Sequence, residues 1–136
     1  MRIEDFLPGY ILEKAIVSGS EYGWRREDFK QVVEVAYSHR LAIVGGQIQF
    51  KLPDGTCEMY WYSYDTNDRL KNESWLDYCL RTKSECLKKF RELPSNYELV
   101  REGIESFNFL KAKDKKRVDL EKYLIFIIYF DKSENT

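Results

Sequence analysis

The sequence predicts an α+β fold, in which a small antiparallel or mixed β-sheet packs against about four helices. Apolar residues recur at helical spacing over residues 25–40 and in the segment that follows Ser74. Residues 41–52 and 57–65 flank a turn and read as a β-hairpin. Residues 123–130 form a continuous apolar run that is typical of a strand covered on both faces.

Length and composition indicate one domain that covers residues 1–136. The chain is 43% hydrophobic and 33% charged, which is typical of a folded globular protein rather than a disordered one. Its 22 basic and 23 acidic residues give a net charge of −1. Nucleic-acid-binding domains usually carry a basic excess, so we expect no nucleic acid partner.

The cysteine content and the apolar runs favour a cytoplasmic protein. Three cysteines are an odd number, and the chain does not open with the charged and then apolar segment of a secretory leader. The longest apolar run, residues 123–130, is too short to span a bilayer as a helix, which needs about 20 residues. We therefore expect neither a disulfide framework nor contact with a membrane.

The first quarter of the chain predicts two helices. Residues 1–17 favour a short helix because Pro8 suits a first helical turn. The polar residues 18–20 then interrupt the pattern. A longer helix is expected over residues 25–40, with acidic residues in its first turn and an apolar stripe at Phe29, Val32, Val33 and Ala36.

The predicted hairpin has clear alternation in its first strand and a break within it. Residues 53–56 supply proline and glycine for the turn between residues 41–52 and 57–65. Gly45 and Gly46 interrupt the first strand and indicate a bulge or a close approach of another backbone. Apolar and polar residues alternate after the break, with the apolar set at Ile48, Phe50 and Leu52.

The second half of the chain predicts a loop and a long helix. Residues 66–73 are polar and read as the loop. Ser74 is a suitable N-cap, and residues 94–96 end the helix. The spacing of Trp75, Cys79, Cys86 and Phe90 places these four residues on one face.

Three further segments complete the chain. Residues 97–110 predict another helix, and residues 111–117 read as a basic connecting loop. This loop is either solvated or in contact with phosphates or an acidic partner. Residues 123–130 should form a central strand of the sheet rather than an edge strand.

The sequence lacks the usual signatures of an active site, so we expect a protein that is not an enzyme. His39 is the only histidine, and its place beside Arg40 at a helix end suits capping or solvation. A dyad of His39 with Cys57 stays open as an alternative. The cysteine spacing is not that of a zinc site, and Gly45 and Gly46 do not belong to a phosphate-binding motif. We therefore expect no metal and no cofactor.

The second predicted strand carries the most informative pattern. Tyr60, Tyr62 and Tyr64 alternate with Met59 and Trp61, which would place the three tyrosines in a row on one sheet face. Such a row either packs beneath a helix or forms a recognition surface. Acidic residues surround it and would match a basic partner, namely Glu58, Asp65, Asp68, Glu73 and Asp77.

Three segments resemble the small immunity proteins of bacterial polymorphic toxin and contact-dependent inhibition systems. They are EYGWRREDF (21–29), LAIVGGQIQF (41–50) and LPDGTCEMYW (52–61), and together they cover less than half of the chain. The resemblance implies a cytoplasmic inhibitor that binds one toxin domain tightly, many such toxins being nucleases with basic clefts. Trp24 and residues 45–47 would then serve the fold.

The predicted partner-binding residues combine this resemblance with the surface argument. An acidic surface rich in tyrosine could occupy a basic cleft as a mimic of nucleic acid. The alternative function is a small-molecule or peptide-binding module that uses the aromatic sheet face. On the first hypothesis the contact residues are Tyr60, Tyr62, Tyr64, Asp65 and Asp68, with Glu58 in support.

Overall fold

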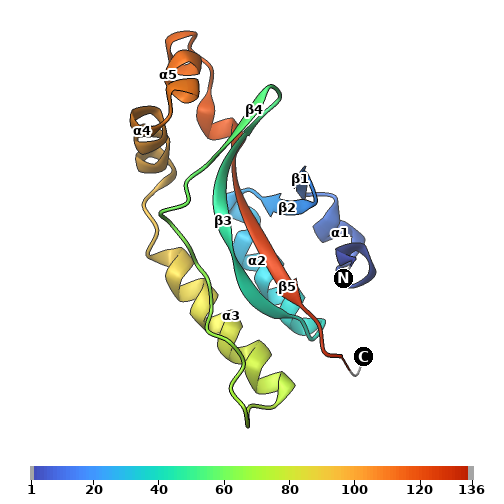
Figure 1. Cartoon of the computed structure of the whole chain (residues 1–136). Helices are drawn as coiled ribbons and strands as arrows, with labels where there is room; N and C mark the ends of the chain where they lie inside the picture. The colour runs from blue at the N-terminus through green and yellow to red at the C-terminus, as the bar shows by residue number, and fades with distance from the viewer. Residues whose placement is uncertain (1, 135–136) are drawn as a thin grey trace.

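A five-stranded antiparallel sheet organises the chain, with the strand order β1-β2-β5-β3-β4 (Figure 1). The computed structural model describes residues 2–134. The predicted α+β class is confirmed. The strands are β1 Ile16–Ser18, β2 Glu21–Trp24, β3 Ala42–Leu52, β4 Gly55–Glu58 and β5 Leu124–Asp131.

Helices cover one face of this sheet and one of its ends. In Figure 1, α2 and α3 lie along the long strands, α4 and α5 lie near β4, and α1 lies beside β1 and β2. Two short 3-10 helices, Ile3–Asp5 and Leu120–Tyr123, precede α1 and β5. The α-helices are α1 Gly9–Leu12, α2 Arg26–Ser38, α3 Trp75–Arg91, α4 Asn96–Ser106 and α5 Asn108–Lys115.

The last strand, β5, is central, as the apolar run predicts. It pairs with β3 over most of its length and with β2 at Gly23↔Ile127 and Trp24↔Phe126. Five consecutive residues, 124–128, are buried, so both faces of the strand are covered. The main hydrophobic core lies between this strand, β3 and the helices, and extends from Ile3 to Ile128 along the chain.

The glycine pair in β3 marks both an irregular register and a close approach. The β3–β5 register shifts between Ile43 and Gly45, and Gly45 has a φ of 144°. A Cβ on Gly46 would lie 2.6 Å from the Tyr64 ring, and a Cβ on Gly45 would lie 2.6 Å from the Asp65 Cα atom. The prediction for this position is therefore confirmed.

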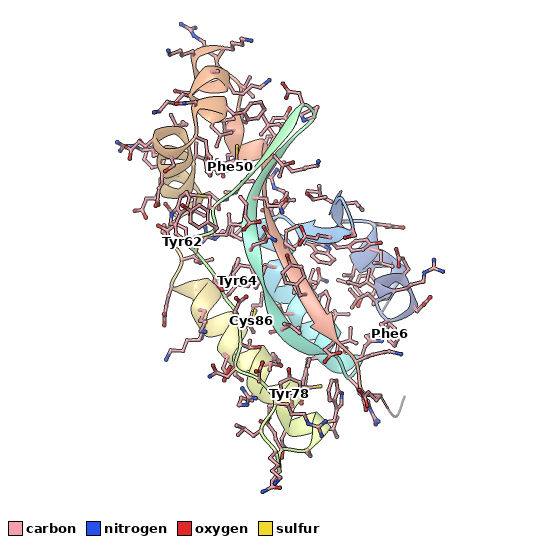
Figure 2. The ribbon with its side chains drawn as sticks, in the orientation of Figure 1. Phe6, Phe50, Tyr62, Tyr64, Tyr78 and Cys86 are labelled. Atoms are coloured by element: carbon pink, nitrogen blue, oxygen red, sulfur yellow. The ribbon has the colours of Figure 1, made fainter. Side chains whose placement is uncertain are left out.

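The predicted second strand is wrong beyond Glu58. The backbone N–H of Met59 still donates to the Ile48 carbonyl, but the chain then leaves the sheet and runs toward α3. The cause is Tyr64, which is fully buried against the rings of Phe29 and Phe90, at centroid distances of 5.0 and 6.0 Å. Figure 2 shows Tyr64 between α3 and the sheet. The expected row of tyrosines on a sheet face does not exist.

Three other segments differ from expectation. Residues 18–20, read as a break, belong to a hairpin: Ser18 ends β1 and pairs with Glu21 of β2, and Gly19 and Ser20 form the turn. The α-helix in the N-terminal stretch is α1. The helix expected over 97–110 is divided at Phe107, whose φ of −121° and ψ of 120° are extended. The expected basic loop 111–117 is largely helical, because α5 continues to Lys115.

The two long helices match the sequence pattern. The apolar stripe of α2 is fully buried. In α3 the hydroxyl of Ser74 accepts a hydrogen bond from the N–H of Asp77 at 3.1 Å, which caps the helix as predicted. Cys79 and Cys86 are both fully buried, in agreement with their interpretation as core residues.

Candidate functional site

The segment that leaves β4 meets α4 and forms an exposed cluster of aromatic and acidic side chains. Tyr60 and Trp61 come from the segment after β4, and the other members come from α4. Figure 2 shows Tyr62, the neighbour of this pair, beside α4. We define the aromatic-acidic surface as Tyr60, Trp61, Tyr97, Glu98, Glu102 and Glu105.

Glu102 fixes the segment after β4 against α4. Its two carboxylate oxygens accept hydrogen bonds from the Trp61 indole N–H and the Tyr62 hydroxyl, each at 2.6 Å. The Trp61 ring also stacks on Phe107, with centroids 5.8 Å apart. The hydrogen bond to Glu102, helped by burial, raises the pKa of Tyr62 to about 12. Both aromatic side chains are therefore held in one orientation.

The sequence of α4 explains why one of its faces carries the acidic side chains. Leu99 and Gly103 are buried, and Gly103 lets the helix approach Phe50, whose ring would lie 2.8 Å from a Cβ there. The hydroxyl of Ser95 accepts a hydrogen bond from the Glu98 N–H at 3.2 Å and caps the helix. The face turned away from the core carries Tyr97, Glu98, Arg101 and Glu105.

Two aromatic rings of this surface are largely open to solvent, and a third is partly so. Tyr60 is 77% exposed, Tyr97 is 69% exposed and Trp61 is 38% exposed. Tyrosine and tryptophan offer large, rigid contact areas and are enriched at binding hot spots. The neighbouring carboxylates favour a positively charged contact. Arg101 offsets part of this charge and lies over the Tyr97 ring at 5.8 Å.

The structure divides the three predicted tyrosines among different roles. Tyr60 belongs to the aromatic-acidic surface, and Tyr62 is half-buried against Glu102. The prediction that Tyr64 contacts a partner is wrong, because this residue is fully buried and its hydroxyl donates to the Gln47 carbonyl at 3.0 Å. Burial raises its pKa well above the usual value.

The three predicted acidic residues do not gather at the tyrosines. Asp65 accepts a hydrogen bond from the Gly46 N–H at 3.1 Å, and the carbonyl of Asp68 accepts one from Arg81 at 3.0 Å. Glu58 is the cross-strand neighbour of Gln49, so both side chains lie on the same face of the sheet, the one opposite the helices. Instead, Glu102 bonds Trp61 and Tyr62, and Glu98, Glu102 and Glu105 line one shallow pocket with Tyr97. Their helical spacing within the predicted helix 97–110 was the signal that could have located them.

The sheet face opposite the helices is polar rather than aromatic. The Gln47 and Gln49 amides donate to the Glu21 carboxylate at 3.1 and 3.3 Å, and the Ser18 hydroxyl donates to Gln49 at 2.8 Å. Tyr129 also donates to Glu21. The alternative function, a small-molecule or peptide-binding module, relied on a row of tyrosines on the sheet, and Tyr60, Tyr62 and Tyr64 do not form that row.

The candidate catalytic and metal-binding residues are not brought together. His39 follows α2 at one end of β3, while Cys57 pairs with Phe50 near the other end, about 26 Å away along the strand. Burial raises the pKa of Cys79 to about 11 and that of Cys86 to about 12, which keeps both thiols protonated at neutral pH. Within residues 2–134, no three side chains of the metal-binding types gather to hold an ion.

Comparison with known protein families, curated proteins and solved structures found no match for this chain. The resemblance to immunity proteins therefore rests on the three quoted segments and stays a prediction. Trp24, which lies in the first of these segments, is fully buried, and its indole N–H donates to the Ile11 carbonyl at 2.9 Å.

In the part of the chain described, no helix has the length and apolar character needed to cross a membrane.

Proposed function

We propose that this protein works by binding a basic protein partner through the aromatic-acidic surface, as an immunity protein binds and neutralises a toxin domain. The observation that carries the proposal is a pair of exposed tyrosines joined through one carboxylate. Tyr60 packs on Trp61, whose indole donates to Glu102, and Glu102 lines a shallow pocket with Tyr97. The cytoplasm is the compartment that this function requires.

Preorganisation supports this function. The hydrogen bonds from Trp61 and Tyr62 to Glu102 order the segment after β4 before any partner arrives. Binding then costs less side-chain and loop entropy than it would on a mobile surface. The surrounding carboxylates would steer a basic cleft, such as that of a nuclease, toward the rings. On this proposal the protein acts by occupying the partner's surface and needs neither catalysis nor a cofactor.

Affinity capture with matched variants tests the proposal. Tagged wild type is compared with Tyr60→Ala/Tyr97→Ala, which removes two exposed rings, in lysate of the organism that encodes the chain. The control is Leu70→Ala/Leu76→Ala, which truncates two other exposed apolar side chains, 62% and 53% exposed. We expect wild type and control to retain the same stoichiometric partner, and the tyrosine variant to lose it.

Neutralisation of the captured partner completes the test. If the partner is a toxin domain, its purified activity should fall when an equimolar amount of wild type or control is added. The tyrosine variant should leave that activity largely intact. A partner held equally well by all three proteins would contradict the proposed surface. A partner whose activity is unchanged by binding would contradict the inhibitory role.

A further inference from the structure

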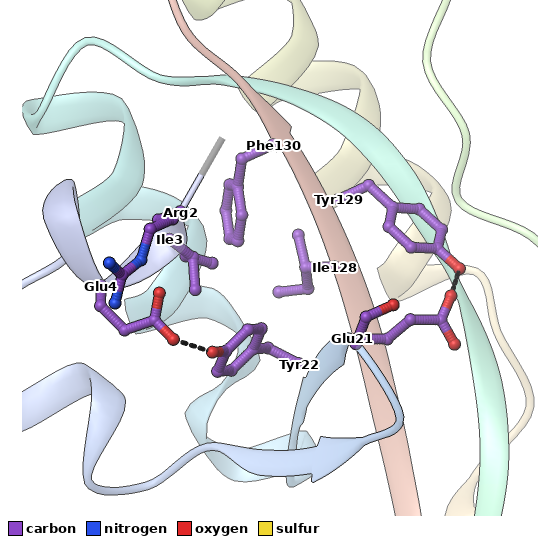
Figure 3. Close-up of a pocket in the computed structure, with 9 residues that line it drawn as sticks. Arg2, Ile3, Glu4, Glu21, Tyr22, Ile128, Tyr129 and Phe130 are labelled. Carbon is purple, nitrogen blue, oxygen red and sulfur yellow. Dashed lines mark hydrogen bonds between the residues drawn. The ribbon is translucent and has the colours of Figure 1, made fainter.

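A pocket opens where β2 separates from β5. The two strands pair only at Gly23↔Ile127 and Trp24↔Phe126, whereas β5 continues in register with β3 as far as Asp131. The wedge between them has a volume of about 620 Å³ and is closed on its other side by the N-terminal residues (Figure 3). Within residues 2–134, no strand pairs with this edge of β5 beyond Ile127.

The backbone of β5 offers hydrogen-bonding groups to this pocket. The carbonyl of Ile127 points toward β3. It accepts from the Tyr64 hydroxyl, and its oxygen would lie 1.7 Å from a Cβ on Gly46, a residue of β3. Along a strand, the N–H and C=O groups of successive residues point to opposite edges. The N–H and C=O groups of Ile128 and Phe130 therefore point to the β2 side, and both residues line the pocket.

The pocket walls differ above and below the plane of the sheet. Ile3, Ile128 and Phe130 give the helix side an apolar surface (Figure 3). On the opposite side, Glu21 is held by the Tyr129 hydroxyl. A second carboxylate of the lining, Glu4, accepts from Tyr22, and Arg2 supplies the one basic side chain among the lining residues.

We propose that this wedge binds an extended polypeptide segment, which adds to β5 as a further strand opposite residues 128–131. Unpaired edges of a sheet bind extended peptides through main-chain hydrogen bonds, with alternate side chains giving specificity. The free edge spans four residues, or about 13 Å. One set of ligand side chains faces Phe130 and Ile3 and is apolar, while the alternate set faces Glu21 and is basic. This site lies on different elements from the aromatic-acidic surface.

Titration of the whole isotope-labelled chain with a defined peptide tests the site. The probe is an acetylated and amidated hexapeptide of alternating lysine and valine, and the matched probe carries glutamate in place of lysine. We expect the lysine probe to shift the backbone resonances of Ile128 and Phe130. At about ten times its Kd it should slow hydrogen exchange of their amides about tenfold. The glutamate probe should bind more weakly.

Methylation of the probe distinguishes strand addition from side-chain docking. In an added strand, the N–H groups of only one alternate set face β5. N-methylation of all the valines or of all the lysines should therefore abolish binding in one case and spare it in the other. Glu21→Gln should weaken the lysine probe several-fold while leaving a threonine-for-lysine probe unchanged. Equal binding of both methylated probes, or no shift at Ile128 and Phe130 at millimolar lysine probe, would overturn the proposal.

Discussion

Glu102 is the residue on which the proposed surface depends most. It bonds both Trp61 and Tyr62, so the orientation of the segment after β4 follows from a single carboxylate. An amide in its place keeps one acceptor and loses the negative charge. The consequence is measurable at Tyr62, whose pKa is raised to about 12 chiefly by this hydrogen bond.

We predict that Glu102→Gln lowers the pKa of Tyr62 toward its usual value. In the wild type the pKa of folded Tyr62 lies above the unfolded value, so its contribution to stability is present below pH 10 and is lost as pH rises through about 12. The Cζ resonance of Tyr62, followed by NMR during alkaline titration, checks this. Glu105→Gln, which removes an exposed charge from the same helix, is the control. An unchanged Tyr62 midpoint in Glu102→Gln would contradict the assigned cause.

Gly46 carries a second residue-level prediction. A Cβ there would lie 1.7 Å from the Ile127 carbonyl oxygen and 2.6 Å from the Tyr64 ring. Gly46→Ala should therefore lower the free energy of unfolding by about 3 kcal/mol through overpacking. Gly9→Ala is the matched control, because a Cβ there meets nothing within 4 Å, and it should not destabilise the protein. Urea unfolding of both variants measures the difference.

At the scale of elements, Arg81 makes several of the hydrogen bonds that hold the loop between β4 and α3. Arg81 on α3 donates to Glu73 at 2.7 and 2.9 Å and to Glu85 at 2.9 Å. It also donates to the carbonyls of Asn67 and Asp68. Paired contacts of this kind are geometrically specific and hold the loop on the helix.

This arrangement predicts an acid-dependent loss of stability. The Arg81 guanidinium lowers the pKa of Glu73 from its usual 4.5 to about 2. Because the folded pKa lies below the unfolded value, Glu73 stabilises the protein above pH 4.5, and this contribution is lost as pH falls toward 2. Glu73→Gln should be less stable than wild type at neutral pH, with a difference that shrinks across this window. Unfolding of Glu13→Gln, an exposed control, should follow the wild type. If the difference in unfolding free energy between wild type and Glu73→Gln did not change with pH, the pairing of Glu73 with Arg81 would be contradicted.

Helices and strands were predictable where their own residues determine burial. Local sequence was enough for three features: the apolar stripe of α2, the Ser74 cap of α3 and the apolar run of β5. Residues 59–65 have an equally good strand pattern, yet Tyr64 is buried edge-on against the stacked rings of Phe29 and Phe90. These two rings come from α2 and α3, so no local pattern could reveal where Tyr64 packs.

At the scale of the whole molecule, the proposed surface joins segments about 40 residues apart in the sequence. Trp61 and Glu102 meet only because β4 ends early and α4 packs against Phe50 through Gly103. The sequence predicts Tyr60 as a contact residue and places Glu58, Asp65 and Asp68 near it along the chain. In the structure, the carboxylate that bonds this segment is that of Glu102 on α4. The predicted row of tyrosines did not form, and the contact of Trp61 and Tyr62 with Glu102 depends on tertiary packing that no local pattern specifies.

The dissociation constant of the captured partner tests the central claim most directly. Calorimetric titration of that partner into wild type, Tyr60→Ala/Tyr97→Ala and the control Leu70→Ala/Leu76→Ala compares two exposed surfaces of the same molecule. We predict that the tyrosine variant raises Kd at least about 30-fold, a loss of about 2 kcal/mol, while the control changes Kd by less than about threefold. A tyrosine variant that binds as tightly as the wild type would contradict the account.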